Sequence, residues 1–182
     1  MATEKFYIKR NDLQPYCKII IAGDGETSLY VQSIYDDSTI TVNSTLDFPT
    51  SGSLRVSDYI TITYSGKSAT TFTSCIWYGG ATAQVFPIGT SVQEVMNLSG
   101  TSIVFTMKTV DGVTIKVNRQ VASITNANGG EVEYKWVAGN TDTSGNYLAE
   151  FEITPNTGGK YTIPKEPSNK LVIVVVDDLD VI

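Results

Sequence analysis

The stretch TDTSGNYLAEFEIT, residues 141–154, decides the fold class because its second half repeats with a period of two. The side chains alternate there between two sets, with Tyr147, Ala149, Phe151 and Ile153 in one and Leu148, Glu150 and Glu152 in the other. This period is typical of a β-strand that has one face in the core and one in water. EVEYKWVAG, residues 131–139, alternates in the same way, with Val132, Tyr134 and Trp136 against Glu131, Glu133 and Lys135. We therefore expect two strands, each with one wet face.

Three further segments support the same class. SIVFTMKTVDGVTIKVN, residues 102–118, holds two strand-like runs joined by Val110, Asp111 and Gly112, and an Asp-Gly pair supplies the positive φ of a hairpin turn. KLVIVVVDDL, residues 170–179, is apolar on both faces and predicts a central strand or one covered twice. TSVQEVMNLSG, residues 90–100, is the best helix candidate, but it is short and contains β-branched residues. We predict an all-β fold.

Composition narrows the function. The 182 residues carry 13 basic and 19 acidic side chains, a net charge of −6, which argues against binding a nucleic-acid backbone. No apolar run reaches the roughly 20 residues that span a bilayer, and MATEKFYIKRND lacks the apolar region of a secretory signal. We expect a soluble protein that is made in a cytoplasm. Cys17 and Cys75 are too few for a disulfide framework, so we expect reduced thiols.

The sequence proposes no catalytic, cofactor-binding or metal site. It contains no histidine, which removes Ser-His-Asp and Cys-His catalysis and most zinc sites. The pairs Asp36–Asp37 and Asp177–Asp178 are adjacent, so on strands their carboxylates point to opposite faces. Gly23 and Gly25 follow an apolar run, as in a dinucleotide-binding loop, but no helix pattern comes after them. We interpret these glycines as a hairpin or domain-entry turn.

The polar loop before residue 147 has a structural interpretation. A glycine two residues before a tyrosine resembles the tyrosine corner of immunoglobulin-type sandwiches, in which the phenol bonds back to the backbone. Gly145 would make the turn, Tyr147 would be the anchor and Trp136 would fill the core beside Ala149. The alternative is a calcium loop built on Asp142, but that loop lacks the several carboxylates that calcium usually draws on.

A second candidate is the pair Trp77 and Tyr78 in CIWYGG, residues 75–80. On an extended strand the two rings point to opposite faces, so one of them must face outward. Exposed aromatic side chains are enriched at interfaces, and the pair is our candidate contact surface.

Ordered motifs along the chain resemble one known module. They lie at residues 6–15 (FYIKRNDLQP), 97–107 (NLSGTSIVFTM), 130–141 (GEVEYKWVAGNT) and 144–154 (SGNYLAEFEIT), with Pro164 ahead of the last strand. Together they resemble the immunoglobulin-like domain of tailed-bacteriophage virion proteins, similar to the N-terminal domain of the baseplate upper protein family. FPTSGSLRVSDYITITYSGKSATTFTSC, residues 48–75, resembles another phage structural motif, although Ile76, Trp77 and Phe86 replace the usual continuation.

The resemblance implies a domain organisation and a role. It implies a β-sandwich formed by residues 1–25 and 95–182, with a β-rich subdomain inserted at 26–94. It implies a non-enzymatic structural protein of the virion, in the tail, baseplate or neck, whose partners are copies of itself and other virion proteins. A capsid decoration or head-fibre protein is the alternative in the same class. A carbohydrate-binding adhesin that uses the inserted subdomain to hold a host glycan is the alternative from a different class.

Overall fold

The computed structural model describes residues 4–57, 60–156, 158–164 and 171–177. All of the regular secondary structure in these residues is β-strand, so the all-β prediction is confirmed. Among them there is no helix long and apolar enough to cross a membrane. The chain divides into two compact units: unit 1 comprises residues 1–19, 100–125 and 132–182, and unit 2 comprises 20–99 and 126–131. The sequence motifs instead place the inserted part at 26–94.

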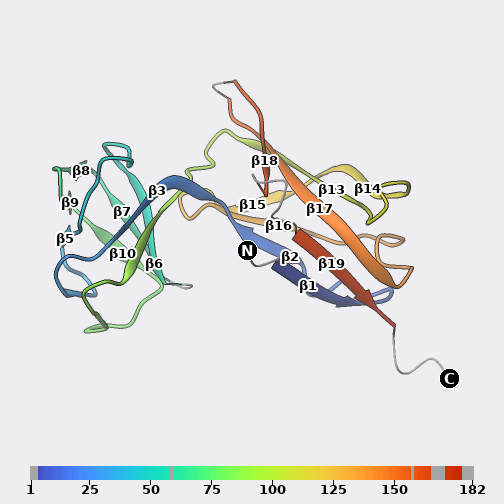
Figure 1. The fold of residues 1–182 in the computed structure, drawn as a ribbon, viewed down its shortest axis with the longest axis horizontal. Coiled ribbons are helices and arrows are strands. Elements are labelled where there is room, and N and C mark those ends of the chain that lie inside the picture. Colours follow the sequence, from blue (N-terminus) through green and yellow to red (C-terminus); the bar gives the residue numbers. More distant parts are fainter. Residues whose placement is uncertain (1–3, 58–59, 157, 165–170, 178–182) are drawn as a thin grey trace. The chain divides into compact units, whose positions relative to one another are not determined.

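Unit 1 contains two sheets (Figure 1). Its strands are β1 (Glu4–Lys9), β2 (Cys17–Ile20), β13 (Ser102–Thr109), β14 (Ile115–Val121), β15 (Ser123–Asn126), β16 (Glu131–Tyr134), β17 (Gly145–Thr154), β18 (Tyr161–Ile163) and β19 (Leu171–Val176). The larger sheet has the order β1-β19-β17-β13-β14, with β18 also paired to β17, and the smaller one has the order β15-β16-β2. Strand β1 runs parallel to β19, whereas β17 is antiparallel to β13, β18 and β19.

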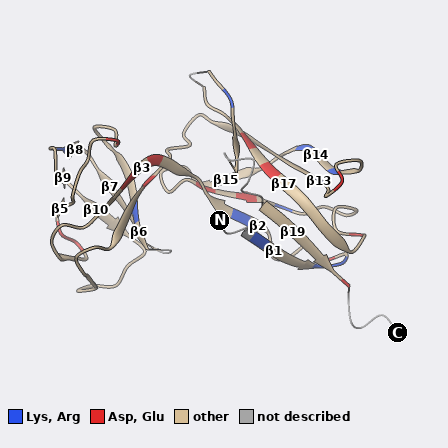
Figure 2. Cartoon of the chain, viewed as in Figure 1, with Lys and Arg blue, Asp and Glu red and all other residues tan. Residues whose placement is uncertain are grey.

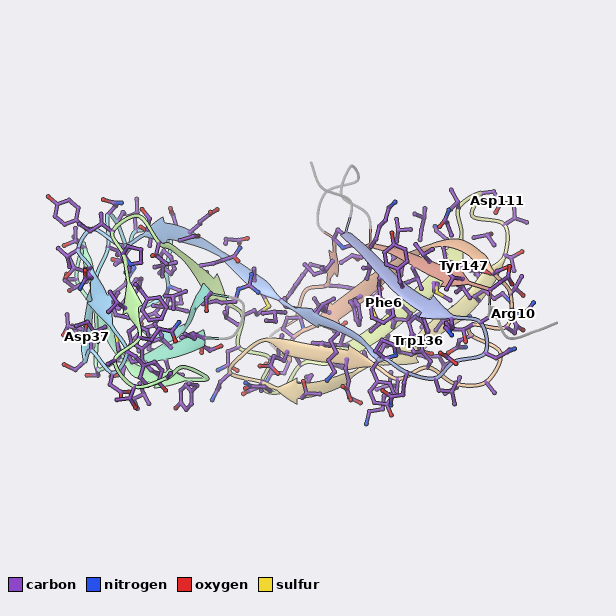
Figure 3. All side chains as sticks on the ribbon, turned by 90° about the horizontal axis from the view of Figure 1, so that it is seen from below. Phe6, Arg10, Asp37, Asp111, Trp136 and Tyr147 are labelled. Atoms are coloured by element: carbon purple, nitrogen blue, oxygen red, sulfur yellow. The ribbon has the colours of Figure 1, made fainter. Side chains whose placement is uncertain are left out.

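Aromatic rings from both sheets form the centre of unit 1. The Phe105 ring on β13 lies 4.3 Å from the Tyr134 ring on β16 and 4.9 Å from the Phe151 ring on β17, measured between centroids. Trp136 meets Phe105 edge-on at 5.8 Å, and Phe6 of β1 lies 6.0 Å from Trp136 (Figure 3). These rings bury a large apolar area between the sheets and hold the elements of unit 1 together.

The predicted strands of unit 1 are found, with two corrections. The strand predicted over residues 131–139 ends at Tyr134, so Trp136 lies beyond β16. In β17 the side chains of Tyr147, Ala149, Phe151 and Ile153 are buried, as the alternation predicts. The hairpin is confirmed as well, because β13 pairs with β14 and Gly112 has a φ of 77°. The wet face predicted for residues 131–139 is wrong at Glu133, which is only 7% exposed. Lys135 and Lys18 lie 3.3 Å and 3.5 Å from its carboxylate and supply the partners that a buried charge needs.

Unit 2 is built from shorter strands. They are β3 (Ala22–Ser28), β4 (Ser33–Ile34), β5 (Thr39–Thr41), β6 (Gly52–Ser57), β7 (Ile60–Tyr64), β8 (Gly66–Lys67), β9 (Thr71–Thr73), β10 (Ile76–Tyr78), β11 (Val85–Phe86) and β12 (Ser91–Val95). A five-stranded sheet has the order β10-β7-β6-β12-β3, and smaller sheets pair β11 with β4 and arrange β5-β9-β8. Fully buried side chains such as Leu54, Ile62, Phe72 and Val92 form its core.

The turn predicted at Gly23 and Gly25 is wrong, because both glycines lie inside strand β3. A Cβ added at Gly23 would lie 2.2 Å from Cδ of Glu94, and one at Gly25 would lie 2.8 Å from Cδ1 of Phe48. The Gly25 N–H also donates to Oε2 of Glu94 over 2.9 Å. The glycines therefore make room for two side chains that pack directly on the backbone.

Strand β19 lies between β1 and β17, so the central position predicted for it is confirmed. Ile173 is fully buried on one face, whereas Val174 is only partly buried on the other.

We expect Ile173→Asp to prevent cooperative folding of unit 1, because a buried, unpaired carboxylate costs several kcal/mol. Val174→Asp should fold with a lowered melting temperature. Soluble yield and tryptophan-fluorescence melting test this, and equal behaviour of the two variants would contradict it.

An ion cluster on the outer face of β17 predicts a pH dependence (Figure 2 shows the acidic positions along this strand). Arg119 donates two hydrogen bonds to Glu152, at 2.6 Å and 2.7 Å, and Lys160 lies 2.7 Å from the same carboxylate. These contacts lower the pKa of Glu152 from 4.5 to about 2, with the Arg119 hydrogen bonds as the largest cause and the Lys160 hydrogen bond as the second.

A lowered pKa in the folded state gives stabilisation that is present above 4.5 and is lost as the pH falls towards about 2. We expect the melting temperature to fall across this range, and to fall less in Glu152→Gln, which has no carboxylate to protonate. Thermal melts at several pH values measure the effect. If the melting temperatures of the wild type and Glu152→Gln fall equally with pH, the cluster contributes nothing to the pH dependence of stability.

Candidate functional site

The loop ahead of β17 is anchored by Tyr147. Its buried side chain donates a 2.7 Å hydrogen bond from the phenol to the carbonyl of Thr143, and Gly145 adopts a φ of 147° between them. Thr141 at the start of the loop donates to the carbonyl of Asp12, and Trp136 donates from Nε1 to the carbonyl of Pro15, both over 2.9 Å. The loop is thus tied to the segment that follows β1, and the Thr141 hydroxyl and the Thr143 carbonyl are used in hydrogen bonds within the protein.

Asp142 is paired with Lys116 of strand β14. Its carboxylate accepts hydrogen bonds from Lys116 and from the Thr143 hydroxyl, and these lower its pKa, with Lys116 the larger cause. In the part of the chain that the structure describes, no three His, Cys, Asp or Glu residues gather as metal ligands would. The positive charge beside the Asp142 carboxylate is thus supplied by the Lys116 ammonium group.

Neither Cys17 nor Cys75 forms a disulfide, and both are buried. Burial raises the pKa of the Cys75 thiol to about 11, which keeps it protonated and unreactive near neutral pH. Cys17 lies on β2, in the other unit. These are packing residues.

The pair Trp77 and Tyr78 splits between the two faces of β10. Trp77 is 5% exposed, stacks on Phe86 at 5.3 Å and donates from Nε1 to the carbonyl of Asp37 over 2.9 Å. It belongs to the core of unit 2 and is not available for contact. Tyr78 is 51% exposed, so it alone of the pair faces solvent.

Tyr78 stands beside a groove on the open face of the five-stranded sheet. The groove has a volume of about 350 Å³ and is lined by Thr61, Thr63, Tyr78, Gly79, Asn126, Asn128, Gly129 and Glu131. A second hollow of about 540 Å³ shares Thr63, Tyr78 and Asn128 with it and extends towards Tyr64, Glu94 and Asn97. We call the two hollows together the Tyr78 groove. All of its lining residues belong to unit 2, which includes residues 126–131 and with them the last residue of β15, Asn126, and the first residue of β16, Glu131.

A second feature of unit 2 is an apolar ribbon, formed by segments 29–35 and 84–90. The segments run antiparallel, with hydrogen bonds between Leu29 and Thr90 and between Tyr35 and Gln84, and with Ile34 directly opposite Val85. Large apolar side chains are exposed on both segments: Tyr30 63%, Val31 44%, Ile34 41%, Val85 51% and Ile88 68%. Neither segment contains a charged residue.

Sequence reasoning missed the ribbon and most of the groove. The apolar residues of LYVQSIY and QVFPIGT look like ordinary strand positions, and their exposure depends on a pairing between distant segments. Asn126 and Asn128 lie more than forty residues from Tyr78. The one available signal was the adjacency of Trp77 and Tyr78, which correctly required one exposed ring.

No family model matches this sequence, and comparison with curated proteins and with solved structures returned no match. The resemblance to the phage domain therefore stays a prediction from the sequence motifs.

The Tyr147 anchor can be tested by removing its hydroxyl. We expect Tyr147→Phe to lose about 0.5–1.5 kcal/mol of unfolding free energy, because the partly buried hydrogen bond to Thr143 is lost. Asp142→Ala should cost less, since its ion pair is exposed. Urea unfolding with and without calcium measures both. A calcium-dependent stabilisation that disappears in Asp142→Ala would instead support the calcium loop.

Proposed function

We propose that the protein is a non-enzymatic structural subunit that binds copies of itself in a symmetric assembly. The observation that carries this proposal is the apolar ribbon of unit 2, whose large side chains are exposed on both segments. Soluble proteins rarely leave a contiguous apolar surface uncovered, and such surfaces mark contacts with other proteins. Aromatic and aliphatic side chains at the centre of a patch are the usual anchors of an interface.

The charge of the chain favours a second copy as the occupant of the ribbon. The chain carries a net charge of −6, so two copies repel one another through most of their surface. The ribbon itself has no charged residue, so two ribbons can pair without burying a charged residue of either one; the nearby carboxylate of Asp37 is held by hydrogen bonds from Ser33 and from the Ile34 N–H. An uncharged apolar patch can also face a copy of itself without like charges meeting, as a two-fold contact between identical subunits requires.

The features of unit 1 support an immunoglobulin-like sandwich. Two sheets bury aromatic rings between them, and Tyr147 makes the hydrogen bond of a tyrosine corner. With the ordered motifs, these features favour a structural protein of a tailed-phage virion, placed in the tail, baseplate or neck. Unit 2 would then be the inserted subdomain, and the partners would be copies of the chain and neighbouring virion proteins.

Two alternatives to this role can be tested by experiment. A capsid decoration or head-fibre protein would have the same fold, and antibody labelling of intact particles separates head from tail. A carbohydrate-binding adhesin is favoured by one specific observation, the Tyr78 groove in unit 2.

The self-association is tested by placing a charge on the ribbon. We expect the wild-type protein to associate with rising concentration, and Val85→Lys to weaken this at least about tenfold, because the partner cannot solvate a buried ammonium. Val113→Lys is the matched control, since Val113 is also a valine, is 80% exposed and lies in the hairpin of unit 1. Sedimentation velocity measures the mass. A wild type that stays monomeric, or equal association of both variants, would overturn the proposal.

A further inference from the structure

The strand register places Tyr78 among hydroxyl groups. In the antiparallel pairing of β10 with β7, Tyr78 lies opposite Thr61 and Ile76 lies opposite Thr63, so these four side chains share one face of the sheet. Trp77 lies opposite Ile62 on the other face, where both are buried. The flat ring of Tyr78 therefore stands on the outer face, beside the hydroxyls of Thr61 and Thr63.

Amide side chains form the opposite wall of the groove and are held in fixed orientations. Asn126 accepts a hydrogen bond from the Gly129 N–H at 2.9 Å and donates to Glu131 at 3.2 Å. Asn97 donates from Nδ2 to Oδ1 of Asn128 at 3.3 Å, which directs the amide nitrogen of Asn128 away from Asn97. Side chains that are already oriented lose less conformational entropy when a ligand binds.

The segment that carries these amides is fixed to the sheet. Ile21 donates from its backbone nitrogen to the carbonyl of Gly130 over 2.9 Å, and Leu98 donates to the carbonyl of Ala127 over 2.9 Å. A Cβ at Gly130 would lie 2.7 Å from Cγ1 of Val95, so this backbone packs directly on β12. The groove is thus preformed between a sheet face and an anchored turn, and its size is within the range of small-molecule sites.

The chemistry of the lining selects the ligand. An amide both donates and accepts hydrogen bonds, and so does a hydroxyl, so asparagines and threonines match a ligand that carries many hydroxyl groups. The exposed Tyr78 ring offers a flat apolar face to a ring with C–H groups on one side. Among the residues that the structure describes, the groove is lined by Glu94 and Glu131 but by no Lys or Arg, which disfavours phosphates, carboxylates and nucleic acids.

We propose that the Tyr78 groove is a binding site for a neutral oligosaccharide, with Tyr78 as the stacking platform and Asn126 and Asn128 as hydrogen-bonding partners of the sugar hydroxyls. No residue of the apolar ribbon lines the groove, so self-association and sugar binding can be tested with different variants.

The test uses the full chain on a printed array of neutral and acidic glycans, followed by saturation-transfer NMR with maltotriose, cellotriose, lactose and chitotriose. We expect binding to at least one neutral oligosaccharide. Tyr78→Ala should weaken it at least about tenfold, because the central aromatic contact is lost. Asn128→Ala should weaken it as well. Ile76→Ala is the matched control, since Ile76 is exposed on the same strand and face but does not line the groove.

Several results would overturn the proposal. Failure to bind any neutral saccharide, or binding only to acidic glycans, would remove the ligand class. Equal binding by wild type and Tyr78→Ala would place the sugar elsewhere. Tyr78 is half exposed, so Tyr78→Ala should fold, and a melting curve checks this. If it unfolds, Asn128→Ala decides in its place, and unchanged binding in that variant would reject the site. The Val85→Lys variant should bind sugar like the wild type, which separates this proposal from self-association.

Discussion

The structure of unit 1 depends on burying a few aromatic rings between its two sheets. Phe105 touches Tyr134, Trp136 and Phe151, and so connects β13 to the strands of both sheets. Trp136 in turn fixes the segment after β1 through its hydrogen bond to the carbonyl of Pro15. The buried Tyr134 hydroxyl donates to Asn140, which also accepts from the Val137 N–H and thereby shapes the next loop. The same side chains provide apolar area and direct the polar loops, so packing and loop geometry are set together.

Unit 2 solves a different packing problem, because its strands are short. Trp77 stacks on Phe86 and contacts Tyr35, and its indole nitrogen donates to the carbonyl of Asp37. This one side chain therefore holds several short segments against the core. The Tyr64 phenol donates to the carbonyl of Pro49, and burial followed by the nearby Glu94 charge raises its pKa to about 12. A core made from many short strands leaves long connecting segments at the surface. The ribbon is made largely from such segments, and in the groove Gly79, Asn128 and Gly129 come from them while Thr61, Thr63 and Tyr78 stand on strands.

Local patterns in the sequence predicted the local structure well. The alternation of residues 146–154, the Asp-Gly turn and the apolar run ending at Val176 correspond to β17, the β13–β14 hairpin and the inner strand β19. The failures are all contacts between distant segments. The buried charge of Glu133 is compensated by Lys18 from another strand together with the neighbouring Lys135, and Gly23 and Gly25 are explained by Glu94 and Phe48. The Tyr78 groove and the apolar ribbon likewise require pairings that no local period encodes.

The parallel pairing of β1 with β19 has a consequence for synthesis of the protein. Residues 4–9 and 171–176 are hydrogen-bonded neighbours, and β19 separates β1 from β17 in the finished sheet. During translation β1 leaves the ribosome before the other described strands, and it can pair only after β19, the last of them, has been made. Most of unit 2 is a continuous stretch, residues 20–99, and its strands pair within that stretch. We therefore expect unit 2 to fold first on the ribosome, although unit 1 begins earlier in the chain.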